Sequence, residues 1–272
     1  MDLLDAIRLR HTDNNKFLPD MVKPEHIKLL IEAAARSPSH FNSQPWRFVL
    51  IRDVALRAAL AELAGASMKE LMEGPFFERY RQYFRFNEKE TERAGDGIYI
   101  DRVPTVLKPM LRQAFNPQVG KLMGTFGVSN MLGRNQADLV RSAPLIIAIA
   151  LSKAEYRPGE MSELYSTISL GAVIQTFWLV TTSLNMGMQF ISTPLEVPER
   201  KALIADMLGV PDDYELLALF RMGYRDPNVS RNPIDWTSSQ RKEFTTLASA
   251  DKWAGELQDD LRTAPSILLT EK

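Results

Sequence analysis

The sequence contains no cysteine. This absence excludes a disulfide framework, a thiolate metal site and a cysteine nucleophile together. The three histidines, His11, His26 and His40, have no metal-ligand spacing, and no HExxH motif or cluster of carboxylates accompanies them. We therefore predict that the protein holds no metal ion.

A charge bias is also absent, because 33 basic and 34 acidic residues give a formal net charge of -1. A nucleic acid or an anionic membrane is therefore not favoured as a partner. The opening residues MDLLDAIRLRH include Asp2 and Asp5 and lack the extended apolar core of a secretory signal. We expect a cytoplasmic protein.

The common catalytic and phosphate-binding motifs are missing as well. No GxGxxG, GxxxxGK[ST] or GxSxG pattern occurs in the chain. The SxxK match at Ser239–Lys242 is four letters in a polar tail, which is a weak signal for a nucleophilic serine. Because no self-contained acid/base or nucleophilic site is visible, a bound cofactor would have to carry any chemistry.

One long segment, from Leu164 to Leu195, has no charged residue. Its length suggests a membrane span. However, serine, threonine, asparagine and glutamine recur along it, and lipid would strand their polar groups. We therefore predict a helix over about Met161–Asn185 that protein surrounds on all sides, a stop at Gly187 and a strand over Met188–Ser192.

Hydrophobic periodicity and helix breakers predict the remaining elements. Helices are expected from Leu3 to the basic end at Arg8–His11, from Pro24 to before Pro38, from Asp53 to about Glu73, over Pro198–Leu208 and over Ser238–Leu257, and strands over Arg47–Arg52, Pro144–Leu151 and Glu215–Tyr224. The Pro144–Leu151 run is almost wholly apolar, which is typical of a strand buried on both faces. About four strands among six or more helices predict one α+β domain over residues 1–272, with a central sheet.

The segment from Gly74 to about Asn135 is the least regular part of the chain. Six aromatic residues lie within residues 76–86, and proline breaks and a glycine-rich stretch with glycines at 120, 124, 127 and 133 follow them. We interpret it as a flexible connector or a lid inserted at about residues 74–135. Its aromatic residues are either ordinary packing or a wall for a substrate.

Two clusters of polar residues remain to be explained. Arg10-His11-Thr12 follows the first helix, where the helix dipole favours cations, but the same side chains would also suit a phosphate monoester. The second cluster is Arg36–Trp46 (RSPSHFNSQPW), in which two prolines stiffen a loop rich in hydroxyls and amides. Such a loop is either a capped turn or a rigid edge that matches the alternating acceptors and donor of a flavin rim.

Taken in order along the chain, these clusters resemble the nitroreductase family of FMN enzymes. The resemblance rests on Arg10-His11-Thr12 with Phe17, on Arg36–Trp46, on the strand APLIIAIA, on the uncharged helix ending in LNMGMQFISTP, and on MGYRD with a later Arg231. It covers most of residues 1–60 and 140–235. It departs from the family pattern at Asn185, where a glycine is usual, and at Thr193, where a smaller residue is common.

The resemblance implies a nitroreductase-like fold, with a mixed or antiparallel central sheet flanked by helices, in an intertwined homodimer. It also implies two FMN sites at the dimer interface, with the uncharged helix buried there. The residues that it assigns to FMN fall into three groups: Arg10, His11, Thr12 and Arg231 at the phosphate; Pro38, Ser39, His40 and Asn42 from the loop of the partner subunit; and Phe190, Ser192 and Thr193 near flavin N5.

The activity implied by the resemblance is flavin-dependent oxidoreduction. NAD(P)H would deliver hydride to flavin N5, and the reduced flavin would pass it to a nitroaromatic, a quinone or a similar small electrophile, with no catalytic side chain. Two alternatives stay open. One is a specialised member of the family, such as a reductive dehalogenase, and the other is a flavin-binding protein without enzymatic activity.

Overall fold

The computed structural model describes residues 1–100, 128–228, 240–266 and 268. At its centre is a four-stranded sheet in the order β1-β4-β6-β5, in which every neighbouring pair is antiparallel. The α+β class and the antiparallel central sheet are therefore confirmed. The strands are β1 (Trp46–Ile51), β4 (Leu145–Ser152), β5 (Met186–Phe190) and β6 (Tyr214–Tyr224).

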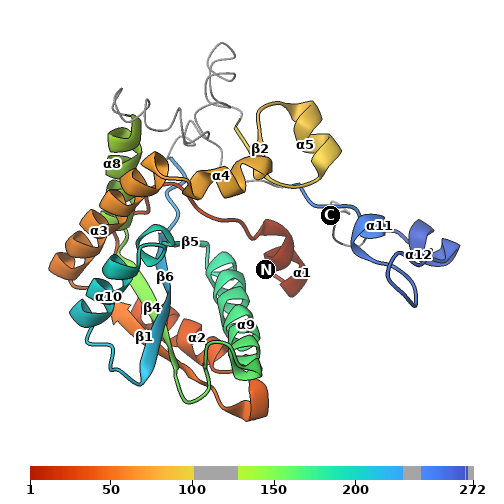
Figure 1. The fold of residues 1–272 in the computed structure, drawn as a ribbon. Coiled ribbons are helices and arrows are strands. Elements are labelled where there is room, and N and C mark those ends of the chain that lie inside the picture. Colours follow the sequence, from red (N-terminus) through yellow and green to blue (C-terminus); the bar gives the residue numbers. More distant parts are fainter. Residues whose placement is uncertain (101–127, 229–239, 267, 269–272) are drawn as a thin grey trace.

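Helices cover both faces of this sheet (Figure 1). One face packs against α2 (Pro24–Ala34) and α9 (Met161–Ser183), and the other against α3 (Val54–Glu73), α8 (Val128–Arg141) and α10 (Pro198–Met207). β4 contributes side chains to the hydrophobic core on each face of the sheet. Leu145, Ile147, Ile149 and Leu151 point to the first face, and Ile146 and Ala148 point to the second. The prediction of a strand buried on both faces is confirmed.

Helix ends with a clear local signal are found where the sequence predicts them. The Asp53 carboxylate accepts a hydrogen bond of 2.8 Å from the backbone N–H of Leu56 and so caps the start of α3. Pro24 and Pro198 each stand in the first turn of a helix. The first helix, α1, runs over Leu3–Leu9 and ends before Arg10.

The prediction of a helix over Ser238–Leu257 is wrong. Only α11 (Phe244–Leu247) and α12 (Asp259–Thr263) are helical in the described part of this tail. Asp251 and Ala254 have left-handed φ angles of 59° and 60°, and a right-handed helix cannot continue through either residue. Trp253 is 98% exposed and none of the described residues 240–257 is buried, so this part of the tail has no packed apolar face that could hold a longer helix.

The segment from Gly74 onward contains more regular structure than its sequence predicts. It forms α4 (Phe76–Tyr80), α5 (Glu88–Ala94) and a parallel pair of two-residue strands, β2 (Phe84–Arg85) and β3 (Ile98–Tyr99). Gly120, Gly124 and Gly127 lie outside the described residues. The assignment of a lid to this segment, like the single-domain organisation, stays a prediction.

Gly133 is not part of a connector, because it lies inside α8, where that helix crosses α3 at Gly65. A Cβ built on either glycine would stand 2.7 Å from the backbone oxygen of the other. The two backbones therefore touch, and neither position can take a side chain without separating the helices. The correct explanation of this glycine is close helix packing, which local sequence does not reveal.

The helix stop lies at Asn185 rather than at Gly187. Asn185 follows the last turn of α9 with a left-handed φ of 54°, a conformation that asparagine tolerates better than most residues. This geometry explains how Asn185 can stand where the family pattern has a glycine. Gly187 instead belongs to β5, where a Cβ would lie 2.4 Å from the ring of Phe17.

The long helix α9 is buried on one side only within a single chain. Val173 and Phe177 lie in the core, whereas Leu164 is 50% and Ile168 63% exposed. By length and composition this helix could cross a membrane, but core helices of soluble proteins pass the same test. Burial on all sides is therefore not reached within one chain, and a second surface would be needed to cover Leu164 and Ile168.

Candidate functional site

The segment from Arg10 to Leu18 lies against β5 and β6. The backbone N–H of Asp13 donates to the carbonyl of Met188, and that of Leu18 donates to the carbonyl of Tyr224, at 3.0 and 2.9 Å. Both bonds are made by backbone groups and hold the segment against the sheet at Asp13 and at Leu18. We name residues 10–18 the strap.

Arg10 lies at the start of the strap, with its guanidinium carbon 5.6 Å from the ring centroid of Trp178 in α9. Within the described residues it has no ion pair with a carboxylate. Partial burial lowers its pKa, and the positive charge of Arg241 lowers that pKa further. Two cations thus lie near one another, and an anion placed between them would be attracted to both.

A row of aromatic rings joins Arg10 to the end of β5. Trp178 meets Phe220 edge-on with centroids 5.7 Å apart, and Phe220 stacks on Phe190 at 5.0 Å. Phe190 is 40% exposed and forms the open end of the row. The indole N–H of Trp178 is buried and has no hydrogen-bond partner among the described residues.

The chain turns at the end of β5 and presents free backbone donors. In the described part of the protein, neither the N–H of Ser192 nor that of Thr193 has an acceptor. These two residues open the short 3-10 helix η4 (Thr193–Leu195). The Thr193 side chain is buried, and its hydroxyl donates to the carbonyl of Ala64 at 3.3 Å, so only its backbone can face a ligand.

His11 and Thr12 lie between Arg10 and the buried Asp13 and are both partly exposed. His11 Nδ1 lies 2.9 Å from the carbonyl oxygen of Leu9, and its Nε2 lies 3.6 Å from Asp13 Oδ2. The imidazole is therefore held from two sides at the position that the sequence assigns to a phosphate.

The Arg36–Trp46 loop is held in a strained conformation. Phe41, Asn42 and Gln44 have left-handed φ angles of 50°, 56° and 44°. Ser39 Oγ accepts from the backbone N–H of Gln44 at 3.0 Å, and Gln44 Nε2 donates to Asn42 Oδ1 at 3.2 Å. The loop is thus stiff, as its composition predicts, and its polar groups partly satisfy one another.

One chain does not bring this loop to the strap. The ring of His40 stacks on Tyr165 of α9 with centroids 4.2 Å apart, whereas Arg10 lies over Trp178 of the same helix. Tyr165 and Trp178 are separated by about 20 Å along the helix axis at 1.5 Å per residue. Pro38 and Asn42 are exposed beside His40. Arg231 lies outside the described residues.

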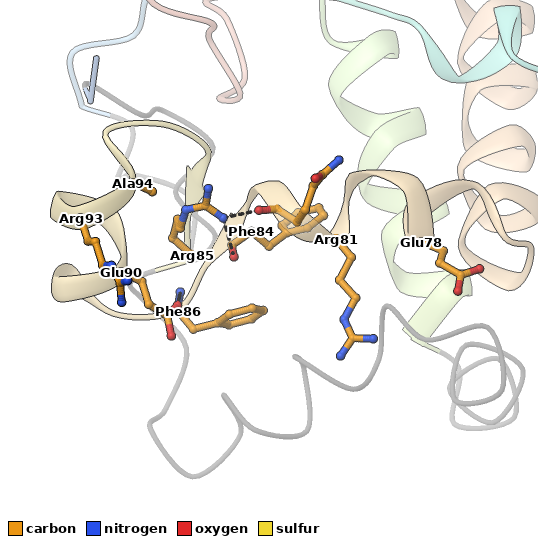
Figure 2. A pocket seen from close by; sticks show the side chains of 9 residues that line it. Glu78, Arg81, Phe84, Arg85, Phe86, Glu90, Arg93 and Ala94 are labelled. Carbon is orange, nitrogen blue, oxygen red and sulfur yellow. Dashed lines mark hydrogen bonds between the residues drawn. The ribbon is translucent and has the colours of Figure 1, made fainter. Parts of the chain in front are cut away.

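A separate hollow of about 680 Å³ lies in the α4–α5 region (Figure 2). Arg81 and Phe86 point to the same side of it, and Arg85 is bound to Asp96 by an ion pair. Its lining also includes Glu78, Gln82, Phe84, Glu90, Arg93 and Ala94. The charges of both signs nearly balance, so the hollow does not favour an anionic or a cationic ligand.

The model of the nitroreductase family matches residues 7–224. This chain belongs to the nitroreductase family. It is 38% identical over 66 residues to NADH dehydrogenase of Thermus thermophilus, an alignment that covers 24% of this chain and 32% of the other. The chain thus matches about a third of the length of this curated relative.

Solved structures of nitroreductase-like proteins share the fold. A BluB-like flavoprotein from Clostridium difficile is 19% identical with a TM-score of 0.56, over 93% of this chain and 100% of its own. The NADPH:FMN oxidoreductase of Vibrio harveyi, complexed with NAD+, is 15% identical with a TM-score of 0.55, over 96% and 81%. At these identities the likeness shows the fold alone.

Sequence reasoning missed Arg241 in this member of the nitroreductase family. It stands beyond the end of the family match and carries no motif, yet its charge reaches Arg10. The neighbouring Lys242 lies 3.4 Å from Asp96, so the tail returns to the body of the protein at this point. The one feature of the sequence that could have pointed to Arg241 as an anion-binding residue is that it stands beside a second basic residue, Lys242.

Proposed function

We propose that the protein is an FMN-dependent oxidoreductase that passes hydride from NAD(P)H to a nitroaromatic, a quinone or a similar small electrophile. Membership of the nitroreductase family supports this proposal. The observation that carries it is the aromatic row, because it joins residues predicted for the two ends of one cofactor, Arg10 and Phe190, through contacts that local sequence does not show.

The described residues fit FMN in three respects. Arg10 and Arg241 would meet the phosphate, aided by His11 and Thr12, because charge-assisted hydrogen bonds to phosphate are strong. The unpartnered indole N–H of Trp178 is a buried donor that a ligand oxygen would satisfy. Phe190 offers an exposed aromatic surface for a flat ring system.

Bound FMN would supply hydride acceptance and donation at N5, so no catalytic side chain is required. The free N–H groups of Ser192 and Thr193 would stabilise negative charge on the ring system, as preorganised backbone donors do elsewhere. The α4–α5 region would exclude water and select the acceptor. A cytoplasmic location, without a nucleic-acid or membrane partner, belongs to the same proposal.

The proposed assembly is a homodimer with FMN at the interface. Its support is the separation between the two groups of predicted ligands, since Pro38, Ser39, His40 and Asn42 lie far from Arg10 in one chain. Phe41 is 92% exposed at the tip of the same loop, and α9 leaves Ile168 uncovered. A second copy would bury both surfaces and bring its loop to the strap.

The first test is an absorbance spectrum of the purified protein, followed by anaerobic titration with NADH and with NADPH. We expect a yellow protein, or one that turns yellow after FMN is added, whose flavin absorbance near 450 nm is lost on titration. A protein that stays colourless with FMN would overturn the proposal. Bound flavin that neither nucleotide bleaches would support the alternative of a flavin-binding protein without enzymatic activity.

The second alternative, a specialised enzyme such as a reductive dehalogenase, needs a substrate comparison. Steady-state turnover of a nitroaromatic panel is measured beside turnover of halogenated phenols with the same reductant. We expect the nitroaromatics to be the better substrates. If dehalogenation were faster, a halogenated phenol would be the preferred acceptor, and the assignment of FMN as the cofactor would still hold.

A further inference from the structure

Arg221 of β6 has a completely buried side chain whose charge plays no part in the proposed chemistry. We propose that Arg221 is a positioning residue that locks the strap onto β5 and so sets the spacing between the groups at the FMN phosphate and those near N5. This inference rests on the proposed function, because it assigns the two ends of the site to FMN.

The guanidinium of Arg221 holds the strap through backbone carbonyls. Its Nη2 donates to the carbonyl of Asp13 at 2.7 Å, and its Nη1 donates to that of Asn15 at 3.0 Å. Its guanidinium carbon also lies 4.5 Å from the ring centroid of Phe17. One side chain thus contacts three strap residues. These residues follow Arg10–Thr12, the group assigned to the phosphate.

The same guanidinium holds β5. Its Nε donates to Oε1 of Gln189, the residue opposite Arg221 in the β5–β6 ladder. The amide of Gln189 then donates through Nε2 to Asn14 Oδ1 at 2.6 Å. Gln189 directly precedes Phe190, so one hydrogen-bond network runs from the strap to the residues assigned to the N5 side.

Two glycines make room for this network. Gly187 and Gly223 are cross-strand partners in β5 and β6, and the strap lies over both. A Cβ on Gly187 would stand 2.5 Å from Asp13 Oδ2, and one on Gly223 would stand 2.6 Å from Phe17 Cβ. Without side chains at these positions, the strap approaches the sheet closely enough for Arg221 to reach its carbonyls.

The carboxylate of Asp13 closes the network from the other side. It lies 2.8 Å from Arg225 Nε and 3.6 Å from His11 Nε2, and only 7% of its side chain is exposed. It also opposes the lowering of the Arg221 pKa, which burial reduces to about 9. Replacing buried ionic groups by apolar side chains is often neutral or stabilising in proteins, so we attribute the buried Arg221 guanidinium to a role in fixing geometry.

Arg221 acts through the strap and not on a ligand, because no part of its side chain is exposed. Its removal should therefore affect the phosphate end of the site more than the ring end. Riboflavin lacks the phosphate of FMN, so the ratio of the riboflavin Kd to the FMN Kd isolates the contribution of the phosphate. A general loss of stability would weaken both ligands alike and leave this ratio unchanged.

The test measures both Kd values for the full-length protein and for Arg221→Met, Arg221→Lys and Gln189→Met. We expect the ratio to fall about tenfold or more in Arg221→Met, because charge-assisted phosphate contacts depend on placement. Arg221→Lys should recover part of the ratio, and Gln189→Met should lower it less. The matched control is Arg200→Met, since Arg200 is a partly buried arginine of α10 that binds Ser67 and Glu70.

An unchanged ratio in folded Arg221→Met would overturn the inference. If Arg221→Met does not fold, Gln189→Met decides, because it leaves the buried charge in place and removes only the hydrogen bonds of Gln189 to Arg221 and to Asn14 of the strap. An equal drop in Arg200→Met would also overturn it, since the effect would then follow stability. If the parent protein binds neither FMN nor riboflavin, the proposed function itself is wrong. This outcome differs from an unchanged Kd ratio, which overturns only the role of Arg221.

Discussion

Arg8 and Arg10 are two residues apart at the end of α1, but their surroundings differ. Arg8 forms an ion pair of 2.7 Å with Asp5 in the preceding turn, which satisfies its charge locally. Arg10 lies over Trp178 and near Arg241, and both burial and the second cation lower its pKa. A bound anion would relieve this unfavourable arrangement, which is why we assign Arg10 and not Arg8 to the phosphate.

Arg10→Gln is therefore expected to weaken FMN binding by roughly 10- to 100-fold, because a hydrogen bond between charged groups contributes about 1.5–3 kcal/mol. Quenching of flavin fluorescence on titration measures the Kd. Arg8→Gln is the matched control and should change the Kd less than about twofold, since surface ion pairs contribute little. Equal effects of the two substitutions would remove Arg10 from the site.

Asn185 adopts a conformation that most side chains avoid. Its left-handed φ of 54° ends α9 and starts the turn into β5. Asn185→Ala should lower the free energy of unfolding by about 1 kcal/mol, whereas Asn185→Gly should leave it unchanged or raise it slightly. Urea unfolding followed by circular dichroism measures both. A more stable alanine variant would contradict the assigned backbone geometry.

Among the helices, α3 and α8 cross with their backbones in contact at Gly65 and Gly133. The backbone oxygen of Gly65 would lie 2.7 Å from a Cβ on residue 133, so the helices must separate to admit a methyl group. Gly133→Ala should therefore cost about 1–3 kcal/mol of unfolding free energy, although alanine is the better helix former. Thermal unfolding measures the loss.

The control for this crossing is Asn130→Ala, an exposed position of the same helix. It should stay within about 0.5 kcal/mol of the parent, as exposed substitutions usually do. If Gly133→Ala were as stable as Asn130→Ala, the two helices would not be in backbone contact.

Asp96 connects two elements that are distant in the sequence, since it pairs with Arg85 of β2 and with Lys242 of the tail. The hydrogen bond from Arg85 is the main cause that lowers the pKa of Asp96 below its usual value of 3.8, and Lys242 adds to it. A lowered pKa means that the folded state favours the carboxylate. The stabilisation is therefore present above about pH 4 and is lost as the pH falls below the unfolded value.

Asp96→Asn should lower the melting temperature at pH 6 and have a smaller effect at pH 3, where the carboxyl group is becoming protonated in both states. Differential scanning calorimetry at the two pH values gives the difference. Asp260→Asn, a change at an exposed carboxylate of α12, serves as the control for the loss of one negative charge. A pH-independent effect of Asp96→Asn would mean that its ion pairs do not contribute.

For the whole molecule, the main question is what covers α9. Leu164 and Ile168 form an exposed apolar stripe on this helix, and Phe41 is exposed on the loop whose His40 stacks on Tyr165. Large apolar patches on a protein surface mark interaction sites, and we propose that a second copy of the chain covers this stripe. A homodimer would cover it and would place the Arg36–Trp46 loop of one protomer at the strap of its partner.

Ile168→Glu should therefore shift the protein to a monomer and weaken FMN binding together, because a buried unpaired carboxylate is costly at an interface. Sedimentation velocity gives the assembly state, and fluorescence titration gives the Kd. Leu203→Glu is the control, since Leu203 of α10 is 51% exposed on a different helix. A dimeric Ile168→Glu variant, or a monomer with full FMN affinity, would contradict the proposed interface.

Features that depend on neighbouring residues could be predicted from the sequence. Proline and Asp53 mark helix starts, the apolar run of β4 marks a strand buried on both faces, and the ordered clusters Arg10–Thr12 and Arg36–Trp46 indicate the family. These signals are local, because capping, φ restriction and side-chain alternation act within a few residues. Where such a signal was absent, as in the tail, the helix prediction was wrong.

Contacts between distant residues could not be predicted from the sequence, because they depend on how the elements pack in three dimensions. The crossing of Gly65 and Gly133, the contacts of Phe220 with Trp178 and Phe190, and the approach of Arg241 to Arg10 join residues that are 30 or more positions apart in the chain. The buried charge of Arg221 likewise depends on carbonyls of the strap, more than 200 residues earlier. Such contacts follow from how helices and strands pack, and a local pattern does not contain that information.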